Sequence, residues 1–336
     1  MSLLGSDLPI VAAPMAGGAS TPALVRAVTG AGGFAFLAAG YKTPSAMQAE
    51  MDALSGVEFG MNVFMPNAKP IDPKVFRRYA AELAPEGAPY GLDLADAPLV
   101  HDDDHWRDKI DLLLATPLPV VSFTFAVPSL AAVTALRKAG TRVLATVTNQ
   151  TEAAAVREVG VDGLVVQGRE AGAHSGVHDP TAPIRDVPLP DLVRSCAVGL
   201  PIIATGGVSD AATVAALLSA GADAVMVGTL LLRTDESGAT ETHKNALADP
   251  AFTETVLTKV FTGRPARGLR NGFIDRHQDH APDGYPAVHH LTRGLRTAAA
   301  KAGDADRLHL WAGTGFRHAN TGPAASVITG LAAELP

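Results

Sequence analysis

Residues 201–229, PIIATGGVSDAATVAALLSAGADAVMVGT, contain one complete unit of the predicted fold. The apolar run Pro201–Thr205 is a predicted strand, and Asp210–Ala220 is rich in strong helix formers. Gly221 comes directly after that helix, at the position where glycine is favoured, and a second strand is predicted at Ala224–Gly228. A strand, a helix and a strand in this order indicate a parallel βαβ unit.

The same alternation continues through the first two thirds of the chain. Further helices are predicted at Pro22–Ala31, Ser129–Ala139 and Thr151–Val159, with Thr21 and Ser209 as predicted N-caps. Eight strands without an order reversal, and without a glycine-rich dinucleotide turn after the first, favour a closed (β/α)8 barrel over a doubly wound open sheet. The predicted strands are Ile10–Met15, Phe34–Ala39, Phe59–Phe64, Val120–Ala126, Arg142–Val147, Gly163–Gln167, Pro201–Thr205 and Ala224–Gly228.

Two segments are not accounted for by the strands and helices of a (β/α)8 barrel. Residues 85–119 are longer than an ordinary connection and are interpreted as an insertion in a barrel that spans residues 1–232. Residues 233–336 contain no further strand of the barrel type, and we expect a helical cap that completes the active site. The fold class is therefore α/β, a TIM barrel with a helical C-terminal cap.

Composition excludes several classes of protein. The formal charge of −7 and the lack of a Lys/Arg cluster argue against nucleic-acid binding. The most apolar stretch is broken by Gly221, Asp223 and Gly228, so no membrane span is predicted. The single cysteine, Cys196, excludes an internal disulfide and fits a reducing cytoplasm, and the N-terminus does not resemble a secretory signal.

Glycine-rich turns follow the last two predicted strands. Gly206 and Gly207 come after strand seven, and Gly228 and Thr229 after strand eight. In TIM barrels the loops after strands seven and eight form the usual phosphate site, where backbone N–H groups meet the anion. The pair of turns predicts a phosphate-bearing ligand, although glycines that only relieve crowding are the alternative.

Strand six ends in a loop with a histidine. Gln167 offers both donors and acceptors to the edge of a flavin ring, and Gly172 and Ala173 leave room for a flat ring beside His174. His174 is the candidate base or hydrogen-bond donor, with a purely structural histidine as the alternative. Pro14, Met15 and Asn62, at the ends of strands one and three, are candidates for the walls of the same site.

Two groups of histidine and aspartate residues are candidate metal ligands. The run His101–His105 contains three aspartates, and Arg276–His280 and the pair His289–His290 are rich in histidine. Neither spacing places three ligands together, so we expect no metal site and interpret His101–His105 as a solvated turn and helix start.

Taken together, these motifs resemble the class I nitronate monooxygenases, formerly called 2-nitropropane dioxygenases. The resemblance covers nearly the whole chain in the family's order. It runs through PMAGGASTPALVRAVTGAGGFAFLAAG, FGMNVF, VVQGREAGAHSG, IIATGGVSD, MVGTLLLRTDES, FTGRPARGLRN and LHLWAGTG.

The resemblance implies FMN as the cofactor and His174 as the active-site histidine. It also implies a small-molecule nitronate or nitroalkane and molecular oxygen as reactants, with a carbonyl compound and nitrite as products, and it is compatible with an oligomer. The residues that it places around FMN are Ala13, Pro14, Met15, Asn62, Gln167, Gly172, Ala173, Gly206, Gly207, Gly228 and Thr229.

Departures from the family pattern fall on the substrate side. Ala173 replaces the second glycine before the histidine, Ser175 replaces a basic residue, and Leu230 and Thr314 replace an arginine and a glutamine. The alternative function is the related FMN-dependent enoyl-acyl-carrier-protein reductase, which uses NAD(P)H and usually has glutamate at the position of Gln167. A dehydrogenase of the inosine-monophosphate type would need a nucleophilic cysteine after strand six, and a non-catalytic flavin-binding protein is a further alternative.

Overall fold

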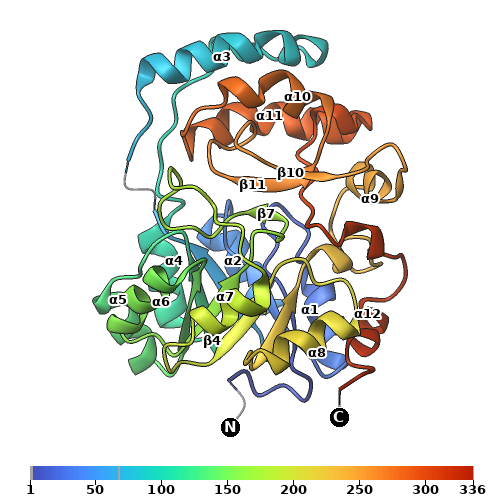
Figure 1. Cartoon of the computed structure of the whole chain (residues 1–336). Coiled ribbons are helices and arrows are strands. Elements are labelled where there is room, and N and C mark those ends of the chain that lie inside the picture. Colours follow the sequence, from blue (N-terminus) through green and yellow to red (C-terminus); the bar gives the residue numbers. More distant parts are fainter. Residues whose placement is uncertain (1–2, 67–68, 336) are drawn as a thin grey trace.

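The computed structural model describes residues 3–66 and 69–335, and its centre is a closed barrel of eight parallel strands (Figure 1). Val11 pairs with Phe34 on one side and with Met226 on the other, which closes the ring. The predicted (β/α)8 barrel is confirmed, and the open sheet is excluded. In order around the ring the strands are β1 (Ile10–Ala12), β2 (Phe34–Ala38), β3 (Gly60–Phe64), β4 (Val120–Thr124), β5 (Arg142–Val147), β6 (Gly163–Gln167), β8 (Ile202–Thr205) and β9 (Ala224–Val227).

Helices cover the outside of this barrel. The hydroxyl of Thr21 accepts a hydrogen bond from the N–H of Leu24, so the predicted N-cap is confirmed there. The prediction that Ser209 is an N-cap is wrong. The carboxylate of Asp210 caps α8 instead, because it accepts a hydrogen bond from the N–H of Thr213 at 2.8 Å. The outer helices are α1 (Pro22–Gly30), α2 (Pro44–Asp52), α4 (Trp106–Ala115), α5 (Leu130–Lys138), α6 (Gln150–Glu158), α7 (Leu189–Ser195), α8 (Ala211–Ser219) and α12 (Ala324–Leu331).

Alternating strand residues divide the barrel core into two parts. One set packs inside the barrel, where Phe34, Phe36 and Met226 belong to a compact apolar cluster. The other set faces the helices in the largest core of the molecule. Gly60 is required inside the barrel, because a Cβ there would lie 2.3 Å from the ring of Phe36.

A second layer covers one end of the barrel, and both chain termini lie at the other end (Figure 1). Its own apolar core contains Phe76 and Tyr79, which precede the predicted insertion, and Leu94 within it, together with Phe261 and Phe273 from the C-terminal third. The cap therefore joins two segments that are far apart in the sequence. Its helices are α3 (Pro73–Gly87), α9 (Glu241–Ala248), α10 (Gly272–His277) and α11 (Ala287–Ala302). Short 3-10 turns occur in both the barrel and the cap: η1 (Ala88–Tyr90), η2 (Thr229–Leu231), η3 (Gln278–His280), η4 (Ala305–Arg307) and η5 (Phe316–His318).

The cap also contains a three-stranded antiparallel sheet that the sequence analysis does not predict. Its strands are β10 (Thr255–Thr258), β11 (Ala266–Leu269) and β7 (Ala173–His174), in the order β10-β11-β7. The strands are too short for a clear alternating pattern. Since β7 belongs to the loop after β6, this sheet fastens the histidine loop of the barrel to the cap.

An ion-pair network holds the insertion onto the C-terminal part of the cap. The carboxylate of Glu86 on α3 is 6% exposed and accepts from Arg276 at 2.6 Å and from Arg307 at 2.7 Å. The two ring nitrogens of His277 lie within 3.0 Å of Glu86 and Glu82. Removing the two arginines would leave the buried carboxylate of Glu86 without a counter-ion, so the network helps to fix the position of α3. Among the helices described, none has the length and apolar character needed to cross a membrane.

Candidate active site

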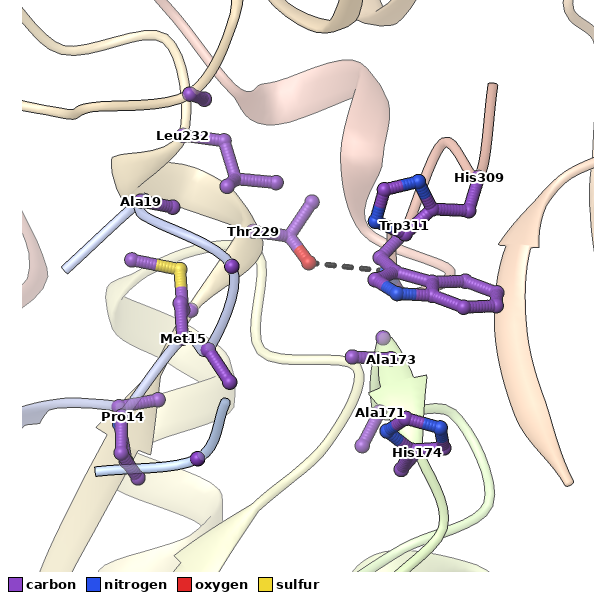
Figure 2. Close-up of a pocket in the computed structure, with 18 of the residues that line it drawn as sticks. Pro14, Met15, Ala19, Ala171, Ala173, His174, Thr229, Leu232, His309 and Trp311 are labelled. Atoms are coloured by element: carbon purple, nitrogen blue, oxygen red, sulfur yellow. Dashed lines mark hydrogen bonds between the residues drawn. The ribbon is translucent and has the colours of Figure 1, made fainter. Parts of the chain in front are cut away.

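A cavity of about 740 Å³ lies between the strand ends of the barrel and the cap. Its size is within the range of about 300–1,000 Å³ that is typical of ligand and cofactor sites. Figure 2 shows Pro14 and Met15 on one side of this space and His174 and Trp311 on the opposite side. All the residues predicted from the sequence line this one cavity: Ala13, Pro14, Met15, Asn62, Gln167, Gly172, Ala173, His174, Gly206, Gly207, Gly228 and Thr229.

The two glycine-rich turns present unused backbone donors to the cavity. In the part of the chain that the structure describes, the N–H groups of Gly206, Gly207, Gly228 and Thr229 have no hydrogen-bond acceptor. Gly206 and Gly207 have φ angles of 120° and 69°, which favour glycine. Several N–H groups that face one space form an anion-binding site of the kind found at phosphate turns.

The strand ends on the opposite side combine a flat apolar wall with one amide. The N–H of Met15 is held by the hydroxyl of Ser20 at 2.8 Å. Asn62 is 3% exposed, and its Nδ2 donates to Ser122 and Thr124 at 2.9 Å each. Its Oδ1 has no partner among residues 3–66 and 69–335, so this acceptor faces the cavity that Asn62 lines.

The histidine loop is held from both the barrel and the cap. Gln167 uses both ends of its side chain, because Nε2 donates to the carbonyl of His174 at 3.1 Å and Oε1 accepts from the N–H of Gly176 at 2.6 Å. Ala173 has a φ of 63°, which a non-glycine residue rarely adopts. His174 pairs with Ala266 in the cap sheet. Gln167 thus positions the loop that presents His174 as well as lining the cavity.

The surroundings of His174 favour its neutral form. Burial, with smaller contributions from the positive charges of Arg264 and Arg296, lowers the pKa of His174 to about 3. Its Nε2 lies 2.9 Å from the hydroxyl of Thr262, and that hydroxyl donates to the carbonyl of Arg264. Because the hydroxyl proton is used there, Nε2 carries the imidazole proton and donates to Thr262. Nδ1 is left as an acceptor without a partner in the described chain.

The C-terminal tail closes the cavity beside the histidine loop. The N–H of Gly313 donates to the hydroxyl of Thr229 at 2.9 Å, a bond drawn in Figure 2. The N–H of Thr314 donates to the carbonyl of Glu170 at 3.1 Å. A Cβ at Gly172 would lie 2.6 Å from the backbone of Ala312, so close contact between loop and tail requires glycine there. Trp311 is thereby placed with its ring 5.9 Å from that of His174.

The cap contributes side chains that are not predicted from the sequence. His243, His289, Arg296 and His309 all line the cavity. Burial is the largest cause of the lowered pKa of each histidine, to about 4 for His243 and well below the usual range for the other two. The sequence of α11 does contain a signal for them, because the polar residues His289, Thr292 and Arg296 recur at helical spacing on its buried face.

The two suspected metal clusters have other roles. No group of three metal-ligating side chains occurs in residues 3–66 and 69–335. His290 pairs with Asp102 at 3.0 Å, and His277 belongs to the Glu86 network. The solvated interpretation of His101–His105 is wrong for Asp104, which forms an ion pair with the fully buried Lys109 at 2.7 Å.

Comparison with known proteins agrees with these features. The family model described as nitronate monooxygenase matches residues 4–334. A probable nitronate monooxygenase of Staphylococcus saprophyticus is 34% identical, over 93% of this chain and 90% of its own. One from Staphylococcus aureus strain Newman is 33% identical, over 99% of this chain and 96% of its own.

Solved structures show the same architecture. A nitroalkane oxidase from Streptomyces ansochromogenes has a TM-score of 0.90 at 46% identity, with 98% of this chain and 96% of that chain covered. FabK from Thermotoga maritima has a TM-score of 0.76 at 24% identity, with 99% and 94% covered, and this likeness concerns the fold alone.

Proposed function

The chain belongs to the nitronate monooxygenase family of oxidoreductases, and we propose that it uses FMN to oxidise alkyl nitronates with molecular oxygen. Two nitronate anions and one O2 give two carbonyl compounds and two nitrite ions. The observation that carries the proposal is the set of unpaired backbone N–H groups at Gly206, Gly207, Gly228 and Thr229, which share one cavity with His174.

The residues present fit FMN at both of its ends. The four backbone donors match a terminal phosphate, and no glycine-rich dinucleotide turn follows β1, which favours FMN over FAD. Pro14 and Met15 would form a wall for the flat ring, and Oδ1 of Asn62 would accept from its N–H edge. Bound FMN would supply the one-electron chemistry that couples oxidation of the nitronate to O2.

The properties of His174 favour a substrate that is already an anion when it binds. A histidine whose pKa is about 3 is neutral at pH 7 and is a weak base, so it removes a proton from a neutral nitroalkane poorly. A preformed nitronate needs no such step. We therefore propose that Nδ1 of His174 takes up a proton only when a neutral nitroalkane is the substrate, while Thr262 holds the opposite nitrogen protonated.

Oxidation of neutral nitroalkanes is the second candidate. The likeness to the Streptomyces nitroalkane oxidase, at 46% identity, favours it. Steady-state rates with nitroethane and with its preformed nitronate at the same pH separate the two, because a nitronate enzyme acts much faster on the anion.

The reductase alternative has weaker support. The FabK likeness shows the fold alone, and Gln167 stands where that family usually has glutamate. Cys196 is buried just before β8, and burial raises the pKa of its thiol to about 11. A thiol of this kind is a poor nucleophile, so the cysteine-dependent dehydrogenase alternative is also disfavoured.

The test begins with the cofactor extracted from the purified protein, which we expect to be FMN. Without oxygen, a nitronate should reduce the flavin rapidly, whereas NADH should reduce it at a negligible rate. Oxygen uptake with release of nitrite should follow when air is admitted. Extraction of FAD, or rapid anaerobic reduction by NADH, would contradict the proposal.

A further inference from the structure

The cap side of the cavity has a buried positive charge without a counter-ion. Arg296 on α11 is 6% exposed and lines the cavity, and no carboxylate lies within ion-pair distance of it among residues 3–66 and 69–335. Burial lowers the pKa of Arg296 only to about 10, so the guanidinium stays protonated at pH 7. A buried charge without a partner favours an anionic ligand in the same space.

Arg296 also determines where the proton of His289 lies. Nη2 of Arg296 is 3.1 Å from Nδ1 of His289 and donates to the carbonyl of the same residue at 3.0 Å. A guanidinium has donors only, so Nδ1 of His289 accepts and Nε2 carries the proton. This Nε2–H is buried and has no partner in the described part of the chain.

The donor pair is rigid. Nε of Arg296 donates to the hydroxyl of Thr292 at 3.0 Å, and that hydroxyl donates to the carbonyl of Phe261 at 2.5 Å. The ring of His289 stacks on Tyr41 at 3.9 Å and 9° between planes. Tyr41 comes from the turn after β2, where Asp104 accepts from its N–H at 3.0 Å. Both the cap and the barrel thus fix the direction of the Nε2–H bond.

We propose that His289 and Arg296 form the substrate-oxygen site, in which Nε2–H of His289 and the guanidinium of Arg296 bind the planar O–N–O group of the substrate. The inference rests on the proposed function for the identity of the substrate. Nitronate oxygens are acceptors with negative charge, which matches two fixed donors, one of them charged. His174 Nδ1 is an acceptor, so it is unsuited to hold the same oxygens.

Arg264, a second buried arginine near the cavity, has other contacts. Arg264 donates to the carbonyl of Val177, and its guanidinium lies 4.0 Å from the centre of the Phe125 ring. It is not among the residues that line the cavity. Arg293 also lines the cavity but is exposed, so Arg296 is the buried arginine of the cap that meets a ligand directly.

The probe for the site is inorganic nitrate, a planar anion with the same O–N–O geometry as a nitronate. Binding to the FMN-loaded protein is measured by isothermal titration calorimetry, which needs no turnover. In His289→Phe the aromatic ring stays and the donor is lost, whereas His289→Gln keeps a donor. Arg296→Met removes the charge. His290→Phe, on the same helix but outside the cavity, is the matched control.

We expect His289→Phe and Arg296→Met to weaken nitrate binding by about 10- to 100-fold, the usual effect of losing a hydrogen bond to a charged group. KM for the nitronate should rise in parallel, FMN content should stay unchanged, and His289→Gln should recover part of the loss. His290→Phe should bind nitrate like the parent protein.

The two proposals fail in different ways. Weaker nitrate binding in the two variants, in a protein that does not oxidise nitronates, would support the anion site and contradict the proposed function. No nitrate binding by the parent protein, or unchanged nitrate affinity and unchanged KM in both variants, would overturn the site. Loss of FMN from His289→Phe would also overturn it, since the donor would then belong to the cofactor.

Discussion

The two halves of the cavity are built from different chemical groups. On the barrel side, the donors are backbone N–H groups of Gly206, Gly207 and Gly228, and the walls are small or apolar residues. On the cap side, the polar groups are side chains, above all His289 and Arg296. Backbone donors at fixed turns suit a cofactor phosphate, whereas a buried side-chain charge suits a smaller anion that exchanges.

His174 lies where these halves meet, and its removal should have the largest effect. In His174→Ala the acceptor at Nδ1 is lost, so kcat with a neutral nitroalkane should fall by about 10²–10⁴-fold, the usual range for proton-transfer groups, whereas the rate with a preformed nitronate should fall less. FMN should remain bound, because the backbone donors of the barrel half are unchanged. Stopped-flow kinetics and flavin content are the measurements, with the exposed His318→Ala as control. Near-normal kcat and KM would show that His174 has only a structural role.

A substitution at Gly228 probes the barrel half alone. A Cβ there would lie 3.5 Å from Ala13, an ordinary contact, so the protein accommodates it. Gly207 is a poorer choice, because its Cβ would lie 2.9 Å from that of Glu170 and its φ is positive. Gly228→Val should weaken FMN binding by about 10- to 100-fold through overpacking against the ligand. Fluorescence titration of the apoprotein with FMN measures this, and Gly330→Ala, in open space on α12, is the control.

If FMN affinity is the same in Gly228→Val and in the parent protein, the phosphate-bearing ligand does not approach this turn.

Acid should destabilise the cap half in particular. His174, His243, His289 and His309 have lowered pKa values in the folded protein, about 3 and about 4 for the first two. Below pH 6.5 the unfolded chain binds protons that the folded protein does not, so the free energy of unfolding falls as pH falls. Each histidine contributes up to about 1.4 kcal/mol per pH unit.

Urea unfolding between pH 7 and pH 4.5 measures this slope. His243→Gln should reduce the slope by up to about 1.4 kcal/mol per pH unit, because one titrating group is removed. An equal slope in the variant and the parent protein would mean that His243 is not held neutral in the folded state.

Thr262 should have the smallest of these effects on catalysis. Thr262→Val keeps the shape but removes the acceptor for Nε2–H of His174, so the imidazole proton is free to move to Nδ1. We expect kcat to fall about 10-fold, the effect of one hydrogen bond, with normal FMN content. Thr262→Ser should restore most of the rate. A rate in Thr262→Val equal to that of the parent would show that another group fixes the tautomer.

The sequence is more informative about the barrel half than about the cap half. Turns such as Gly206-Gly207 are local signals next to their strands, so their place in a barrel follows from strand order alone. His289 and Arg296 meet the cavity only because α11 lies across the barrel end, which depends on packing with the distant insertion. Asp104 shows the same difficulty, since its partner Lys109 is buried by tertiary structure that an acidic run does not reveal.

The most direct test of a cavity divided into a cofactor half and a substrate half is to measure the affinities for FMN and for nitrate in one variant from each half. The FMN dissociation constant and the nitrate dissociation constant at saturating FMN are determined for Gly228→Val and Arg296→Met. The structure predicts weaker FMN binding only in Gly228→Val and weaker nitrate binding only in Arg296→Met. If Arg296→Met loses FMN, or if Gly228→Val loses nitrate while FMN binds normally, the division into a cofactor half and a substrate half is wrong.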